Sequence, residues 1–273
     1  MGRRADLHMH SVYSDGSLTA GDLVRRAKRV GLASISITDH DNTAAIGEAT
    51  EIGLEIGVEV IPGVELSARV DSSEVHILGY FFDFHAPELL DYLSQCRNDR
   101  VRRAERIVEK LNGMNVPLKL EAVLDQAGSG SVGRPHIAHA LVEEGLAESY
   151  SEAFYKYIGY GRPAYEEKPQ ISPREAISLI ASAGGLSFVA HPGKSLDETV
   201  LLELIRSKVD GIEVIHPSHS ADLVQHYRGI VNEYCLLESG GSDFHGSTHS
   251  GADPFGKFSI SEECVEMMRR RLQ

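Results

Sequence analysis

The chain has 273 residues, enough for one large domain, with 42% hydrophobic and 25% charged residues, ordinary values for a globular protein. Its net charge of -13 argues against contact with extended duplex nucleic acid, because such contact relies on positive side chains. No apolar run reaches the length of a membrane span and no apolar leader is present, so we expect a cytoplasmic protein without a membrane partner. The cysteines are scattered without a CxxC pair, and we expect them to be reduced and buried.

The first third of the chain alternates strand and helix patterns. An apolar stripe with helical spacing lies between Thr19, a candidate N-cap, and Gly31, a residue that commonly ends a helix. Only about ten residues separate Glu65 from His76, too few for a crossover helix between parallel strands, so the sheet should be irregular there. The predicted elements are strands at 5–10, 33–37, 58–66 and 75–82 and helices at 18–30 and 43–56.

The rest of the chain begins with a run of helices that interrupts this rhythm. Helices are predicted at 87–111, 120–127, 136–144, 151–157 and 173–183, and then at 197–207, 221–233 and 262–272, with strands at 186–190, 211–215 and 236–243. We interpret 97–168 as a helical insertion subdomain in a domain made of 1–96 and 169–273. Seven strand candidates, most followed by a helix, predict an α/β fold of the distorted barrel type.

Histidine and carboxylate side chains lie at the predicted ends of most strands. A strand places His8 and His10 on the same face, and Asp243 and His245 repeat that spacing. Any single one could be an ordinary hydrogen-bonded residue, but the whole set at one barrel mouth would repel or stay unsatisfied without cations. Mixed imidazole and carboxylate sites suit Mn, Fe or Zn without choosing among them. The candidate metal ligands are His8, His10, Asp15, His40, Glu65, His76, His191, Asp243 and His245.

These side chains belong to motifs that resemble the PHP (polymerase and histidinol phosphatase) superfamily. The further motifs GRPH at 133–136 and EVIHPSH at 213–219 are similar to its stand-alone nucleotide phosphoesterase and 5′→3′ exoribonuclease branch. The resemblance implies a distorted (β/α)7 barrel that binds three divalent metal ions. The motifs that carry it are DLHMHS at 6–11, SDG at 14–16, TDHD at 38–41, GVE at 63–65, HILGY at 76–80, AHP at 190–192 and GSDFHG at 241–246.

The resemblance also implies how the ligands are divided among the metals and what reaction follows. A hydroxide that bridges the metals would attack the phosphate ester of a small nucleotide, such as a nucleoside 3′,5′-bisphosphate, or the 5′ end of a short RNA. The first metal would be held by His8, His10, Glu65 and Asp243, the second by Asp15, His40 and His245, and the third by Glu65, His76 and His191, with Glu65 bridging.

Residues outside the metal set are candidates for substrate binding and catalysis. Arg134 and His136 flank Pro135 at a predicted helix start, where an anion is favoured, although an ordinary cap has the same pattern. His216 could bind phosphate or protonate the leaving oxygen, and His219 could contact the substrate. Asp39 could orient a ligating histidine or cap the next helix. We therefore predict catalytic roles for Arg134, His136, His216 and Asp15 and substrate contacts for Arg134, His136, His216 and His219.

Two features of the insertion have competing interpretations. Five arginines in 97–106 could guide a polynucleotide, but a solvated face paired with acidic residues is the favoured interpretation. Tyr157, Tyr160 and Tyr165 could stack on bases or pack the insertion against the barrel. The segment 247–253 lacks the Lys-Pro pair expected of the branch, which leaves substrate preference open.

Two other functions fit parts of the pattern. A metal amidohydrolase that cleaves a C–N bond could use a barrel with an HxH motif, but it has no evident need for Arg134 and His136 and needs fewer metals. A non-catalytic, metal-stabilised module would not require the complete ligand set. A phosphoesterase therefore remains the favoured hypothesis, with a phosphorylated small molecule, a nucleotide or short RNA as its partner.

Overall fold

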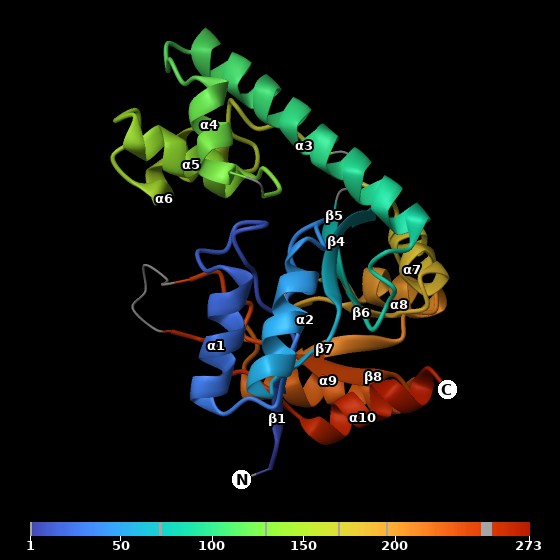
Figure 1. Cartoon of the computed structure of the whole chain (residues 1–273). Helices are drawn as coiled ribbons and strands as arrows, with labels where there is room; N and C mark the ends of the chain where they lie inside the picture. Colours follow the sequence, from blue (N-terminus) through green and yellow to red (C-terminus); the bar gives the residue numbers. More distant parts are fainter. Residues whose placement is uncertain (1, 71–72, 129, 169, 195, 247–252) are drawn as a thin grey trace.

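The computed structural model describes residues 2–70, 73–128, 130–168, 170–194, 196–246 and 253–273. Its strands form a four-stranded sheet in the order β3-β2-β1-β9 and a five-stranded sheet in the order β4-β5-β6-β7-β8, with helices packed around them (Figure 1). The strands are β1 (Arg4–Asp6), β2 (Ser34–Ile35), β3 (Glu59–Val60), β4 (Gly63–Val70), β5 (Ser73–Tyr80), β6 (Leu186–Val189), β7 (Gly211–Ile215), β8 (Leu237–Gly240) and β9 (Ile260–Ser261).

Every helix predicted from the sequence has a counterpart in the structure. Thr19 caps the first of them by accepting a hydrogen bond from the backbone N–H of Asp22, and Gly31 ends it with a φ of 76°. The helix predicted at 151–157 is divided into a short α-helix and a π-helical turn. The helices are α1 (Ala20–Val30), α2 (Ala45–Ile56), α3 (Pro87–Gly113), α4 (Leu120–Ala127), α5 (Arg134–Glu143), α6 (Tyr150–Ala153), η1 (Phe154–Ile158), α7 (Pro173–Ser182), α8 (Glu198–Arg206), α9 (Ala221–Glu233) and α10 (Glu262–Arg271).

The sheet is irregular at the position that the sequence indicated. Strands β4 and β5 form an antiparallel pair, with Gly63 opposite Tyr80, whereas β1 with β2 and β6 with β7 are parallel. Isolated bridges join Met9 to Phe244 and His40 to Glu65, and thus link the two sheets. Within the described residues the sheets are not closed into one continuous barrel, so the architecture observed is a mixed α/β fold.

The predicted number and length of the strands were wrong in two respects. The described part of the chain contains nine strands rather than seven, because Pro62 interrupts the predicted run 58–66 and β9 was missed. Strand β1 ends at Asp6, so His8 and His10 follow it in an extended segment. That segment is still held in the fold, since Leu7 and His10 donate backbone hydrogen bonds to Gly240 and Phe244.

Residues from the far part of α3 to Ala164 share a hydrophobic cluster of their own. In Figure 1 helices α4, α5 and α6 form a lobe at the far end of α3. Helix α3 continues without a break through residue 97, the first predicted boundary of the insertion. The boundaries 97 and 168 remain a prediction.

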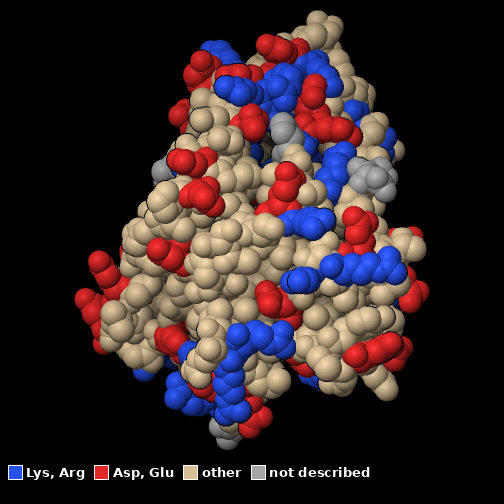
Figure 2. All heavy atoms as spheres, turned by 90° about the vertical axis from the view of Figure 1, so that its right-hand side faces the viewer, with Lys and Arg blue, Asp and Glu red and all other residues tan. Residues whose placement is uncertain are grey.

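The arginines of α3 do not form one basic face. Arg100 and Arg103 are buried, which corrects the expectation of a fully solvated face. Figure 2 shows positive and negative side chains intermixed on the side of the molecule that α3 borders. Among the cysteines, Cys235 is exposed and the other two are part-buried, so the expectation of burial was wrong. No helix in the described ranges is long and apolar enough to cross a bilayer.

Candidate metal centre

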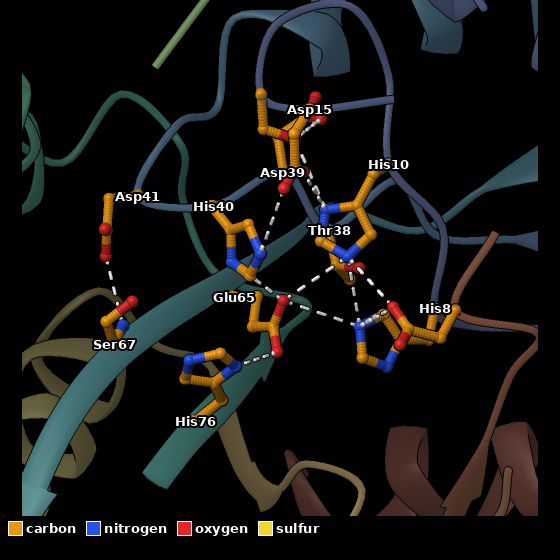
Figure 3. A network of polar contacts seen from close by, with 12 residues as sticks. His8, His10, Asp15, Thr38, Asp39, His40, Asp41, Glu65, Ser67 and His76 are labelled. Atoms are coloured by element: carbon orange, nitrogen blue, oxygen red, sulfur yellow. Dashed lines mark hydrogen bonds and ion pairs between the residues drawn. The ribbon is translucent and has the colours of Figure 1, made fainter. Parts of the chain in front are cut away.

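The carboxylate of Glu65 is the centre of a cluster of imidazoles. Strand β4 carries it, and its side chain is buried. Figure 3 shows four histidines directed toward this carboxylate: His8 and His10 from the segment after β1, His40 from the segment after β2 and His76 from β5. The Glu65 Oε2 atom lies 3.5 Å from His8 Nε2, 3.3 Å from His10 Nε2 and 3.0 Å from His40 Nδ1, while Oε1 lies 2.7 Å from His76 Nδ1 and 2.9 Å from His191 Nε2.

Two aspartates extend the cluster on either side of His10. The Oδ1 atom of Asp243 lies 3.2 Å from His8 Nε2 and 3.3 Å from His10 Nε2. The Oδ1 atom of Asp15 lies 3.3 Å from His245 Nε2, and its Oδ2 lies 3.9 Å from His40 Nε2. All nine predicted ligand side chains therefore lie in one connected cluster.

The ligand atoms fall into four overlapping groups in which all atoms lie within 4.8 Å of one another. The predicted second group, Asp15 with His40 and His245, is contained in one of these and gains His10. The other predicted groups are divided differently. The first lacks Glu65, and the third is split, because His191 groups with His8 whereas His76 groups with His40. The remaining groups are His8 with His10 and Asp243, His8 with Glu65 and His191, and His40 with Glu65 and His76.

Three atoms of the cluster are buried and form no hydrogen bond with any residue that the structure describes. They are Asp15 Oδ1, His40 Nδ1 and Glu65 Oε2. His40 Nδ1 lies 3.0 Å from Glu65 Oε2, and Asp15 Oδ1 lies 3.3 Å from His245 Nε2, so these atoms are in contact with one another but lack hydrogen-bond geometry. Their concentration in one cluster of imidazole nitrogens and carboxylate oxygens, the usual donors to transition metals, fits a site for cations.

The electrostatics of the cluster are consistent with that fit. Burial raises the pKa of Glu65, but His40, His76 and His8 outweigh it and hold the pKa well below its usual range. Burial also lowers the pKa of His40, to about 4, and the carboxylates of Glu65 and Asp15 oppose this shift only in part. Despite burial, nearby carboxylates raise the pKa of His76 and His245 to about 10.

Glu213 is a residue of this cluster that we did not predict. It is completely buried on β7; its Oε1 lies 2.9 Å from His8 Nδ1, and its Oε2 accepts a hydrogen bond of 2.6 Å from the backbone N–H of His191. It lies in the EVIHPSH motif, where we assigned a role only to the histidines. The signal that could have identified it is a glutamate inside a short, otherwise apolar strand.

Asp39 holds the turn at residues 11–14, which directly follows His10. It accepts hydrogen bonds from the backbone N–H and the hydroxyl of Ser11 at 2.7 and 2.6 Å and from the hydroxyl of Ser14 at 2.6 Å. The Ser14 hydroxyl lies 3.3 Å from His10 Nδ1. Asp39 therefore acts on His10 through Ser14, and the alternative of a helix cap was wrong because α2 has no side-chain cap.

The two predicted substrate histidines of the 213–219 motif have different surroundings. His216 Nε2 lies 3.3 Å from Asp243 Oδ2, at the edge of the cluster. His219 Nδ1 lies 2.9 Å from the carbonyl oxygen of Val214, and its Nε2 accepts a 3.0 Å hydrogen bond from the backbone N–H of Gly193. With both ring nitrogens paired to backbone, the geometry of His219 favours positioning of the 191–193 segment over contact with a substrate.

Arg134 and His136 begin α5, as predicted, with Pro135 between them. The Nδ1 atom of His136 accepts a 3.0 Å hydrogen bond from the backbone N–H of Gly133 and thereby caps the helix. The guanidinium of Arg134 lies 5.8 Å from the ring centre of Phe154 and 5.6 Å from that of Tyr165. Of the three predicted stacking tyrosines, Tyr165 thus contacts Arg134, Tyr157 packs against the insertion cluster and Tyr160 is exposed.

A groove of about 730 Å³ connects the cluster with the insertion. We call it the insertion groove; Asp15 and His245 line one side, and Pro135, His136, His139 and Tyr150 line the other. Its volume is within the range of pockets that take small molecules. Segment 247–252, which we expected to influence substrate preference, lies outside the described residues.

Comparisons with known proteins agree with this geometry. The sequence profile of the PHP domain matches residues 6–180. The chain is 36% identical over 247 residues to the 5'-3' exoribonuclease Rnm of Escherichia coli (strain K12), covering 88% of this chain and 84% of that protein. It is 32% identical over 254 residues to a 3',5'-nucleoside bisphosphate phosphatase of Chromobacterium violaceum, covering 91% of this chain and 89% of that protein.

The fold also matches a solved structure from Bifidobacterium adolescentis, of a protein proposed to be a metal-dependent phosphoesterase. The TM-score is 0.89 and the sequence identity is 33%, and the match covers 98% of this chain and 96% of that chain. The agreement therefore extends from the motifs around the histidine cluster to nearly the whole fold. Together with the profile match over 6–180, it shows that the chain belongs to the PHP domain family.

Proposed function

We propose that this protein is a metal-dependent phosphoesterase that hydrolyses a phosphate ester of a small nucleotide, such as a nucleoside 3′,5′-bisphosphate, or the 5′ end of short RNA. The observation that carries the proposal is the buried Glu65 carboxylate in contact with five imidazoles, in a cluster where three buried atoms form no hydrogen bond with the described residues. The relatives named exoribonuclease and bisphosphate phosphatase support the same reaction class.

Three divalent cations, of manganese, iron or zinc, would be held by the nine cluster side chains, with Glu65 shared between groups. Such cations would supply Lewis-acid polarisation of the phosphoryl oxygens and activation of water. Asp15 lies between His40 and His245, and its catalytic role remains a prediction. The mixed donor set suits all three metals and gives no preference.

The remaining residues bind and orient the substrate. Arg134, held over two aromatic rings at the first turn of α5, binds a substrate phosphate. His216, oriented by Asp243, gives a proton to the leaving oxygen. His136 caps α5 and so fixes the helix start that carries Arg134, and its direct contact with substrate remains a prediction.

For the fold we propose the distorted (β/α)7 barrel that the resemblance to the PHP superfamily implies, with 97–168 as an inserted subdomain. The bridges Met9–Phe244 and His40–Glu65 support it, because they link the two sheets directly beside the ligands. In this arrangement β3 and β9 are additions outside the ring of seven. A cytoplasmic location also remains a prediction from the sequence.

A screen of protein loaded with manganese tests this function. It measures inorganic phosphate from the bisphosphate and the sugar phosphates, mononucleotides from the RNA and free amine from the C–N substrates. The substrates are adenosine 3′,5′-bisphosphate, a short 5′-phosphorylated RNA, sugar phosphates and, for the amidohydrolase alternative, N-acyl amino acids. We expect turnover of the nucleotide or the RNA, lost in Glu65→Gln, because an amide is a much weaker metal ligand than a carboxylate. Hydrolysis of the C–N substrates alone would contradict a phosphoesterase.

A further inference from the structure

The insertion groove begins at the metal cluster and extends away from it. Asp15 and His245, both cluster residues, are on one side, and side chains from α4, α5 and α6 are on the other. A phosphate ester bound at the cluster therefore has a path for the rest of the molecule between the loop at 15–17 and the insertion. The volume of about 730 Å³ leaves room for more than a phosphate and a sugar.

Aromatic rings gather on the insertion side of this groove. The ring centres of His139 and Tyr150 are 5.1 Å apart with an angle of 49° between the planes, and Tyr150 is 5.0 Å from Phe154. His139 is exposed, whereas Tyr150 and Phe154 are part-buried against the hydrophobic cluster of the insertion. Tyr150 is thereby a rigid ring and His139 an accessible one, both at the wall of the groove.

The charge of the groove favours an uncharged ligand group at this end. Within the described part of the chain, no lysine or arginine lines the groove, and the only carboxylate there is Asp15, at the metal end. Gln126 and Ser151 add neutral hydrogen-bonding groups. A second phosphate would find no lysine or arginine among these residues, whereas a flat heteroaromatic ring finds stacking surfaces and polar groups for its edges.

We propose that the insertion groove binds the nucleobase of the substrate, by stacking against His139 and Tyr150. This inference rests on the proposed function, since it places the base of the nucleotide whose phosphate is at the metal cluster. It assigns the two ends of the molecule to different parts of the chain. The cluster residues take the reacting phosphate, and His139 of α5 and Tyr150 of α6 take the base, so the insertion determines the preference for nucleotides over other phosphate esters.

The test compares two substrates that carry the same phosphates, adenosine 3′,5′-bisphosphate and the corresponding base-free ribose bisphosphate. His139→Ala and Tyr150→Leu each remove one ring face, and we expect kcat/KM for the nucleotide to fall by about 5- to 150-fold, mainly through KM. The base-free substrate should be unaffected. Tyr155→Ala, at an exposed tyrosine outside the groove in the same lobe, is the matched control and should change neither substrate.

Circular dichroism and a thermal melt verify the fold, and His139→Ala supplies the decisive result if Tyr150→Leu is unstable, because His139 is exposed. Equal losses on both substrates, or no loss on either, would overturn the base site and leave the phosphoesterase function intact. A wild-type protein that turns over neither substrate would overturn the proposed function itself. Wild-type kcat/KM values that are equal for the two substrates would also overturn the base site.

Discussion

The Nδ1 atom of His8 lies 2.9 Å from Oε1 of Glu213, and both side chains are completely buried. The other oxygen of the same carboxylate accepts a hydrogen bond from the backbone N–H of His191. One carboxylate thus orients the ring of His8 and the segment that carries His191. Pairing at Nδ1 leaves Nε2 of His8 directed at Asp243 and Glu65, the arrangement by which a carboxylate behind a histidine prepares it as a metal ligand.

Glu213→Gln should weaken metal binding by about 10- to 100-fold, as is typical for loss of a carboxylate behind a ligating histidine. The amide has one oxygen, so it cannot accept hydrogen bonds from both His8 and the backbone of His191, and it removes the charge that makes the imidazole more basic. Competition of manganese with a chelator, followed by elemental analysis, measures the effect without an activity assay.

Glu203→Gln, on the exposed face of α8, is the control for loss of a glutamate charge at a distance from the cluster. It should bind manganese like the wild type. A Glu213→Gln protein that retains wild-type affinity for manganese would show that the charge of Glu213 has no role in metal binding.

Glu213 also shows where sequence reasoning stops. The nine cluster side chains could be predicted because they lie in short motifs that resemble a known family, and most of them occur in pairs such as His8 and His10 or near strand ends. Glu213 lies inside its strand and reaches His8 across 205 positions of sequence, so no local spacing connects the two. The same limit applies to Asp39, whose partners Ser11 and Ser14 are recognisable only once β1 and β2 are paired.

His191→Ala should lower the metal content by about one ion per chain from the expected three and remove most activity without unfolding the protein. The ring touches Glu65 at the mouth of the fold, whereas the hydrophobic clusters lie behind it, so little packing is lost. Elemental analysis and circular dichroism of the manganese-loaded variant measure the two effects together. His226→Ala, at an exposed histidine of α9, should change neither. Wild-type metal content and turnover in His191→Ala would exclude His191 as a ligand.

The fold itself could be predicted at the level of helices because their caps and apolar periodicity are local. Strands β3 and β9 have only two residues each, too few for any periodic pattern, and their existence depends on partners far along the chain. The burial of Arg100 depends in the same way on tertiary contacts. It pairs with Asp41, the residue after His40, at 2.6 Å, and no pattern within 97–106 predicts that partner.

Lys168 should make the stability of the fold depend on pH in the alkaline range. Its ammonium lies 2.8 Å from Asp41, but burial, together with Arg100, lowers its pKa to about 8 from an ordinary value of 10.5. Between these values the unfolded chain binds the proton more tightly than the folded chain. The free energy of unfolding therefore rises with pH from about 8 to 10.5, by at most about 1.4 kcal/mol per pH unit for one proton.

Lys168→Met removes this titration while Asp41 keeps its contact with Arg100. Urea unfolding of both proteins at several pH values between 7 and 10 measures the difference in stability, in which all shared titrations cancel. We expect the wild type to gain stability relative to the variant above pH 8. A difference that stays constant over the whole range would contradict a lowered pKa for Lys168.

Arg134→Ala should lower kcat/KM for nucleotide substrates. The loss of transition-state stabilisation should be about 2–3 kcal/mol, as expected when a charge-assisted hydrogen bond to phosphate is lost. Lysine should restore only part, because it offers a point charge and not a planar fork. Arg162→Ala is the matched control, since that guanidinium also packs on a tyrosine ring of the insertion, at 4.5 Å from Tyr155. A generic aryl phosphate should lose less if Arg134 holds a second phosphate, whereas equal losses on both substrates would place Arg134 at the reacting phosphoryl group. Unchanged turnover of both substrates would leave Arg134 as a residue that merely packs over Phe154 and Tyr165 at the start of α5.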